Sequence, residues 1–237
     1  MKSITIFRFS PTEGPGHFAT FLERQRLPWK LVKLDEGEPV PESSDASAGL
    51  AFMGGPMGAN DELPWTPGVL ALMRDAVQRE VPVIGHCLGG QLLSRALGGV
   101  VSVNPVREIG WNRVQVDDSA RAREWFGADV EEFITFQWHG DTFSIPPGGE
   151  RILTGAHCPN QAYVVAERHL GMQCHVEMTP EMIASWLESG LGEVEENLAS
   201  PAVQPAEKIR RESPRRLPDL GSMADRLYTR WMAGLRS

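Results

Sequence analysis

The chain has 237 residues, of which 41% are hydrophobic and 23% charged, and its formal net charge at pH 7 is -8. This length suits one large α/β domain or a domain with a small appendage, and the acidic balance argues against nucleic acid or an anionic membrane as the main partner. With no apolar run near the roughly 18 residues of a membrane span, no secretory leader pattern and three cysteines, we expect a cytoplasmic protein without a disulfide framework.

The first part of the chain alternates between strand-like and helix-like segments. Apolar and β-branched runs predict strands at residues 3–9, 29–34, 49–53 and 81–84. Apolar residues at helical spacing predict helices at residues 17–26 and 69–80, and another directly after Cys87. This alternation predicts an α/β fold in which helices flank both faces of a doubly wound, mostly parallel sheet.

Beyond residue 99 the chain is richer in strands. The pattern predicts strands at residues 100–104, 108–116, 133–138, 151–156, 162–167 and 170–176, the last of which carries His175. A short helix is expected at residues 121–126. Another helix should begin after Thr179, because Thr179 suits the N-cap and Pro180 suits the first helical position.

The C-terminal part differs in texture from the rest. Residues 190–218 are polar and rich in proline, which predicts a linker or an irregular wrap. Met223, Leu227, Trp231 and Leu235 then form an apolar helical stripe. We expect this stripe to dock on the parent core; binding a partner protein is the alternative. The predicted organisation is one domain over residues 1–190 and, over residues 191–237, a linker with a helical extension on or near that domain.

Cys87 lies at the centre of the most informative stretch, residues 81–98. An apolar strand-like run ends at Gly85, Cys87 follows at the turn, and Gly89 opens the helix-like segment with Gly90. Glycines permit a turn that is too tight for side chains, and the N-terminus of a helix favours a thiolate. A buried structural cysteine is the alternative, but such a residue needs neither the glycines nor the switch from strand to helix. We therefore expect Cys87 to be a nucleophile.

A cysteine nucleophile needs a base, and the base needs a group that orients it. His175 and Glu177 are two residues apart, so on an extended segment their side chains point to the same face. In a doubly wound sheet they would share the carboxyl edge with Cys87. The N–H of Leu88 and one from Gly54 or Gly55 could stabilise an oxyanion there; the alternative is that these glycines only make a turn.

Taken in order, these residues resemble the class I glutamine amidotransferases, which carry a catalytic triad. The resemblance covers about residues 4–187. It rests on motifs that occur in the family's order: Gly54-Gly55-Pro56, Gly85-x-Cys87-x-Gly89-x-Gln91 and Gln173-x-His175-x-Glu177. Two further motifs, Glu108-Ile109-Gly110-Trp111 and Trp138-His139-Gly140-Asp141, are similar to stand-alone members that resemble the glutaminase domain of GMP synthase.

The resemblance implies a flavodoxin-like fold and a reaction that needs no metal or cofactor. It implies that glutamine is hydrolysed through a γ-glutamyl thioester on Cys87, with His175 as base, Glu177 as orienting group and the N–H groups of Gly55 and Leu88 as oxyanion hole. Substrate-binding residues would be Gly54, Gln91, Trp138, Gly140 and Asp141. Trp138 departs from the small or polar residue that is common there, and Val176 replaces a frequent proline.

Three functions stay open. No Gly-rich ATP loop is found in the sequence, so the ammonia would pass to a separate synthetase subunit or be released by simple hydrolysis. A γ-glutamyl peptidase or hydrolase would use the same triad on other γ-glutamyl compounds. A catalytically silent regulatory subunit is the third possibility, which the intact triad argues against.

The remaining histidines and cysteines suggest one rival site. The pairs His157-Cys158 and Cys174-His175 could suggest zinc, but adjacent residues of a strand point to opposite faces and cannot easily hold one ion. We expect Cys158 and Cys174 to be small core or surface residues, and His17 and His169 to lie on the surface. His139 could support the substrate pocket or be a plain loop residue, and His86 has no assignment.

Overall fold

The computed structural model describes residues 2–236 and is built around a 10-stranded sheet. The strands are β1 (Ser3–Arg8), β2 (Trp29–Lys33), β3 (Ser47–Phe52), β4 (Val83–His86), β5 (Val101–Val116), β6 (Glu132–Phe143), β7 (Gly149–Gly155), β8 (Ala162–Val165), β9 (His169–Met172) and β10 (Ala202–Val203). The helices are α1 (Gly16–Arg24), the 3-10 helix η1 (Leu34–Glu36), α2 (Thr66–Gln78), α3 (Leu88–Ala96), α4 (Ala120–Phe126), α5 (Pro180–Ser189), α6 (Leu191–Glu196) and α7 (Ala206–Met232). The predicted α/β class and the predicted N-terminal elements are confirmed.

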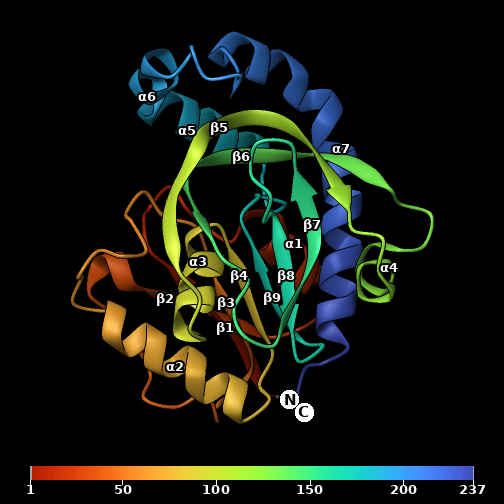
Figure 1. Ribbon diagram of the computed structural model, residues 1–237. Helices are drawn as coiled ribbons and strands as arrows, with labels where there is room; N and C mark the ends of the chain where they lie inside the picture. Colours follow the sequence, from red (N-terminus) through yellow and green to blue (C-terminus); the bar gives the residue numbers. More distant parts are fainter. Residues whose placement is uncertain (1, 237) are drawn as a thin grey trace.

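The parallel half of the sheet has the strand order β2-β1-β3-β4-β9 (Figure 1). This is the flavodoxin-like order, in which the chain reverses direction across the sheet between β1 and β3. Ligands of such sheets bind beyond the carboxyl ends of the strands, near this reversal. The loops after β1, β3 and β4 are therefore the ones to examine for a site.

The other half of the sheet is antiparallel, apart from the short edge strand β10, which pairs with β5 in parallel. β8 pairs with β9, and β7, β5 and β6 continue outward as antiparallel neighbours. β5 is one long strand, where the sequence predicted two, and its pairing with β6 shifts register between Val103 and Glu108. The shift explains the predicted break, because an irregularity of pairing interrupts the alternation of side chains without ending the strand.

Helices cover both faces of the parallel half, as predicted. Phe7 and Phe52 stack with ring centroids 4.5 Å apart on the face that α2 and α3 cover. On the other face Ile4 and Ile6 pack in a second cluster, with side chains of α1, α5 and α7. The side chains of β1 thus alternate between two cores, as the period of a strand requires.

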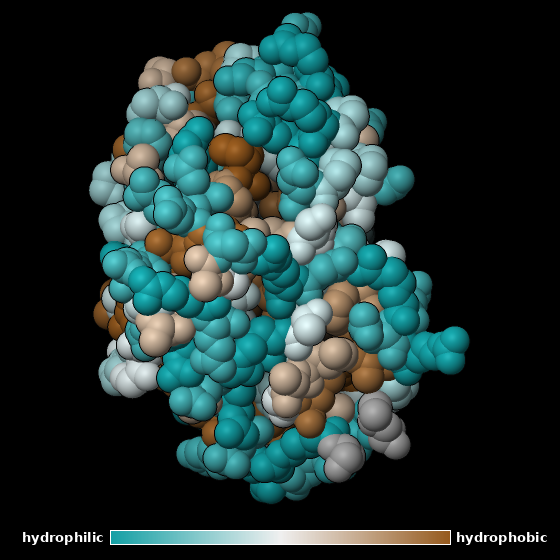
Figure 2. All heavy atoms as spheres, turned by 90° about the vertical axis from the view of Figure 1, so that its right-hand side faces the viewer, coloured by the Kyte–Doolittle hydropathy of each residue, from teal (hydrophilic) through white to brown (hydrophobic). Residues whose placement is uncertain are grey.

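α7 corrects the predicted linker, since it begins at Ala206 and runs through both Pro214 and Pro218. A proline inside a helix costs about 3 kcal/mol, which made a helix unlikely on local grounds. The helix nevertheless forms because it buries apolar residues along its length, including Ile209 and Trp231. Its outer face, with that of α4, is mainly hydrophilic, and apolar atoms are confined to scattered patches (Figure 2).

The C-terminal extension packs on the sheet. The Trp231 ring comes within 2.8 Å of the position that a Cβ on Gly49 of β3 would occupy. Arg236 donates its N–H to the carbonyl of Ala48, also on β3. The division of the chain at residue 190 stays a prediction. Within residues 2–236, α7 and the other helices are all too short or too polar to traverse a lipid bilayer.

His169 contradicts the prediction of a surface residue, because it is fully buried at the start of β9. Both ring nitrogens are buried without a hydrogen-bond partner. Burial, with a smaller effect from Arg168, lowers the pKa of His169 to about 4, from an ordinary value of 6.5. The burial of His169 could not be predicted from the sequence, because its neighbours Glu167 and Arg168 are charged and predict an exposed segment.

The buried His169 predicts a loss of stability in mild acid. Between pH 6.5 and 4 the unfolded chain binds a proton that the folded chain does not, so the free energy of unfolding falls as the pH falls through this window. By pH 5 the loss amounts to about 2 kcal/mol. Urea unfolding at pH 8 and pH 5 should show this loss in the wild type and a smaller loss in His169→Leu. Equal losses in the two proteins would contradict the assignment.

Candidate active site

Cys87 occupies a strained turn between β4 and α3. Its backbone has φ 46° and ψ -104°, a conformation that residues with a side chain rarely adopt. The turn depends on glycines, since a Cβ on Gly85 would lie 2.4 Å from the backbone of Gly89, and a Cβ on Gly89 would lie 2.2 Å from the carbonyl oxygen of Phe52. Sequence and geometry therefore agree that this turn presents the thiol at the start of a helix.

His175 and Glu177 form a tight buried pair. The Nδ1 of His175 donates a hydrogen bond of 2.6 Å to the Oε1 of Glu177, and both residues are almost completely buried. β9, which was predicted to be the last strand, ends at Met172, earlier than predicted, and His175 is held instead by an isolated bridge to Phe136 of β6. The earlier end of β9 does not affect the predicted pairing of the imidazole with the carboxylate.

The pair is electrostatically suited to a charged imidazole. Burial by itself would lower the pKa of His175, but the charges of Glu177 and Cys87 and hydrogen bonds to both raise it well above its usual range. Burial by itself would raise the pKa of Glu177. The charges of His175 and His86 and the hydrogen bond to His175 together outweigh this effect, so the pKa of Glu177 is lowered. With Nδ1 bonded to Glu177, the other ring nitrogen of His175 is the one that serves Cys87. Three side chains from two distant parts of the sequence thus converge.

His86 supports this group from behind, a role that sequence reasoning did not assign. Its Nε2 lies 3.2 Å from the hydroxyl of Tyr228 on α7 and 3.9 Å from the Oε2 of Glu177. Burial lowers the pKa of His86, which favours a neutral ring. The C-terminal helix therefore reaches the far side of the site through Tyr228.

Gly55 and Leu88 lie beside each other near the thiol. A Cβ on Gly55 would come within 2.8 Å of the Leu88 side chain. Within residues 2–236 no protein acceptor takes the backbone N–H of either residue. Gly54 is set further back, between His175 and Glu13. The two free N–H groups are available to an oxyanion at the start of α3.

A cavity of about 460 Å³ opens over Cys87 and His175. Of the predicted substrate-binding residues, Gln91, Trp138, Gly140 and Asp141 line it, together with Gly55. Gly54, Leu88 and Glu177 do not line it and support residues that do. The volume lies in the range of sites for small organic ligands.

One wall of this cavity comes from α5 and α6. The indole of Trp138 donates to Glu193 over 2.8 Å and meets the Trp186 ring edge-on, with centroids 6.0 Å apart. Arg107 pairs with the same Glu193 and lies over Gly140. The unusual Trp138 is thus part of a wall whose other members sequence reasoning missed, because α6 fell within the predicted linker.

Gln91 is engaged within the protein. Its Nε2 donates to the Oε1 of Gln173 over 3.1 Å, and the Nε2 of Gln173 lies 3.4 Å from the sulfur of Cys87. Gln173 belongs to the motif Gln173-x-His175-x-Glu177, but no role was predicted for it. The side-chain amides of Gln91 and Gln173 thus form a chain of hydrogen bonds that ends at the sulfur of Cys87.

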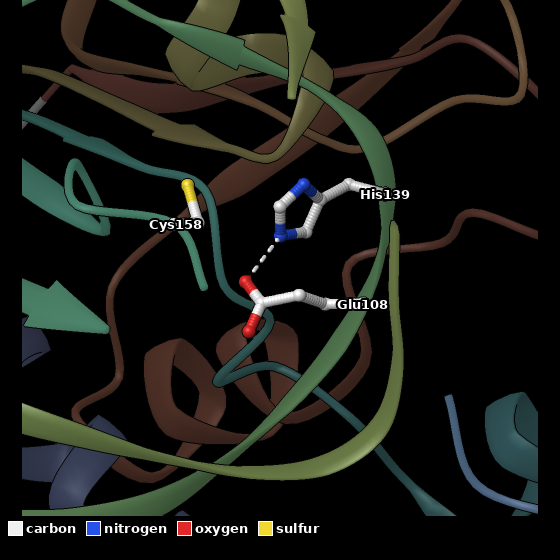
Figure 3. Close-up of side chains that lie close together, drawn as sticks. All are labelled: Glu108, His139 and Cys158. Atoms are coloured by element: carbon white, nitrogen blue, oxygen red, sulfur yellow. Dashed lines mark hydrogen bonds and ion pairs between the residues drawn. The ribbon is translucent and has the colours of Figure 1, made fainter. Parts of the chain in front are cut away.

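Glu108, His139 and Cys158 lie close together (Figure 3), with potential ligand atoms within 4.8 Å of one another, and His139 also lines the cavity. The Nε2 of His139 lies 3.0 Å from Glu108, its Nδ1 lies 2.8 Å from the carbonyl of Asp141, and Gln161 donates to the same Glu108 oxygen. Burial raises the pKa of Cys158 to about 11, so its thiol stays protonated. We interpret this group as a hydrogen-bonded support for the part of β6 that carries Gly140 and Asp141.

Comparisons with known proteins agree with this geometry. The family model for glutamine amidotransferase class-I matches residues 20–191. A glutamine amidotransferase-like protein of Salmonella typhimurium, YfeJ, is 26% identical over 176 residues, which are 72% of this chain and 74% of that protein. The glutamine-hydrolysing GMP synthase of Clostridium perfringens is 36% identical over 136 residues, which are 56% of this chain but only 25% of the synthase. A crystal structure of a glutamine amidotransferase from Methylobacillus flagellatus has a TM-score of 0.97 at 46% identity, covering 100% of this chain and 96% of that one.

Proposed function

Because the chain belongs to the glutamine amidotransferase class-I family, we propose that it hydrolyses the side-chain amide of glutamine and releases ammonia. The observation that carries the proposal is the strained turn at Cys87 facing a histidine whose other nitrogen is fixed by Glu177 at 2.6 Å. A nucleophile, a base and an orienting group in this relation are what acyl transfer requires.

The reaction proceeds in two stages. His175 accepts the proton of the Cys87 thiol, and the sulfur attacks the amide carbon, while the N–H groups of Gly55 and Leu88 stabilise the oxyanion. When the C–N bond breaks, His175 returns the proton to the departing ammonia, leaving a γ-glutamyl thioester. A water molecule that His175 deprotonates then attacks the thioester and releases glutamate and the thiol.

The substrate's α-amino and α-carboxyl groups would bind along the Gln91, Trp138, Gly140 and Asp141 side of the cavity. The cavity volume of about 460 Å³ exceeds what glutamine alone needs, and this favours a second candidate, a hydrolase or peptidase of larger γ-glutamyl compounds. Glutamine hydrolysis in GMP synthases serves a synthesis, so a separate synthetase subunit that accepts the ammonia is a further possibility for this chain. A cytoplasmic location is part of the same proposal.

Two measurements test the proposal together. Ammonia release from glutamine should be compared with hydrolysis of a panel of γ-glutamyl amides and peptides, and a glutamine-mimicking electrophile should label Cys87, as seen by mass spectrometry of the digested protein. Turnover with labelling supports a hydrolase, and the panel identifies its substrate. A folded wild-type protein that shows neither turnover nor labelling would instead be the silent regulatory subunit.

A further inference from the structure

Glu13 is a fourth ionisable side chain at the active site, and the proposed mechanism does not use it. It lies in the loop after β1 and lines the same cavity as Cys87 and His175. Its Oε2 atom is buried and has no hydrogen-bond partner in the protein. A buried carboxyl oxygen without a partner is costly, so this residue needs an explanation.

The loop holds Glu13 firmly. The carbonyl of Thr12 accepts a 2.9 Å hydrogen bond from the indole of Trp186, and the N–H of Glu13 donates to Ser10 over 3.0 Å. Farther on, the N–H of His17 donates to the carbonyl of Glu177 over 2.8 Å. The loop is therefore fastened to the chain segment that carries the triad, and Glu13 is held in position beside it.

Glu13 and His175 flank the same glycine. A Cβ on Gly54 would lie 2.6 Å from the Oε2 of Glu13 and 3.0 Å from the Cε1 of His175. His175 thus has Glu177 on its Nδ1 and the carboxyl of Glu13 near its Cε1. Burial raises the pKa of Glu13 to about 7; the charge of His175 opposes this rise and that of Glu177 adds to it.

The strand order decides which end of a substrate Glu13 meets. Across the sheet, Cys87 follows β4, while Gly54 and Glu13 follow β3 and β1 on one side of it. Trp138, Gly140 and Asp141 belong to β6, beyond β9 on the other side. If the glutamyl group binds along β6, the amine that leaves the tetrahedral intermediate faces His175, Gly54 and Glu13.

We propose that Glu13 forms a leaving-group subsite, which accepts a hydrogen bond from the departing amine and disfavours leaving groups that carry a carboxylate. This inference rests on the proposed function and narrows its substrate class. The preferred substrates are γ-glutamyl amides of ammonia or of neutral or cationic amines, and γ-glutamyl amino acids are poor substrates. Glu13 contacts the amine as it leaves and forms no bond to the sulfur or to the amide carbon.

A matched pair of substrates tests the subsite. γ-Glutamylethylamide and γ-glutamylglycine differ mainly in the carboxylate of the leaving group. At a pH well above the Glu13 pKa of about 7, where the carboxyl is ionised, the wild type should favour the ethylamide in kcat/KM. Glu13→Gln should reduce that preference by about tenfold, because it removes a like charge from the subsite. Glu13→Asp, which keeps the charge, should retain more of the preference than Glu13→Gln does.

The outcomes separate this inference from the proposed function. A wild type that hydrolyses neither compound nor glutamine refutes the proposed function. An active wild type that prefers γ-glutamylglycine, or makes no distinction, overturns the subsite without any variant, so a folding defect in Glu13→Gln cannot hide the result. An equal loss on both substrates in a folded Glu13→Gln also overturns it, because that pattern belongs to a residue that only holds Gly54 in place.

Discussion

Cys87→Ser is expected to lower kcat for glutamine hydrolysis by at least about three orders of magnitude. The serine hydroxyl fits the turn, because it is smaller than the thiol and the backbone strain at φ 46° is the same. It is, however, a far weaker nucleophile, and His175 would have to remove a much less acidic proton. The measurement is ammonia release under single-turnover conditions, together with the urea midpoint of the variant.

Cys174→Ser is the matched control for this change. Cys174 is also buried, but its side chain belongs to the hydrophobic core beneath α5 and α7. This variant should keep kcat within about tenfold of the wild type, although burying a hydroxyl costs some stability. If Cys87→Ser retained normal turnover while folded, the sulfur of Cys87 would have no part in the reaction.

Glu177→Gln should reduce kcat by about three to four orders of magnitude with little change in KM. The amide can still fill the space, but it no longer supplies the charge that raises the pKa of His175 well above its usual range. The amide can also turn its NH₂ group to Nδ1 and thereby favour the wrong tautomer. The imidazolium that forms when the thiol loses its proton would be poorly stabilised.

The rate at which an electrophile labels Cys87 gives a second readout of the same variant. At neutral pH labelling should be slower in Glu177→Gln, because His175 without its carboxylate partner is a poorer acceptor for the proton of the thiol. Glu181→Gln is the control, since Glu181 is exposed in the first turn of α5 and lies outside the cavity. A kcat for Glu177→Gln within tenfold of the wild type would show that the carboxylate does not orient the base.

The turn at Cys87 could be predicted because its constraints are local. Glycines on both sides, an apolar strand before them and a helical pattern after them all lie within residues 81–98. The pairing of His175 with Glu177 was equally local, since a spacing of two residues holds for any extended segment. This pairing therefore did not depend on the end of β9, which lies at Met172, earlier than predicted.

The surroundings of the site could not be predicted in this way. The loop that carries Glu13 has the composition of an ordinary solvated loop. The burial of Glu13 depends on Trp186 and Gly54, which are remote in sequence. The contact of His86 with Tyr228 depends on α7, and the prolines of this segment argued against a helix. The local cost of the two prolines predicts a break in the helix. The burial of the apolar face of α7 in the folded core outweighs this cost, and that burial cannot be seen in the local sequence.

The contact between Tyr228 and His86 has a consequence for the order of events on the ribosome. Synthesis proceeds from the N-terminus, so Cys87 leaves the exit tunnel well before Tyr228, which lies 142 residues after His86. The support of Glu177 by His86 and Tyr228 is therefore completed only after α7 has emerged. We expect the thiol of Cys87 to react slowly with cellular electrophiles in the nascent chain until this support has formed.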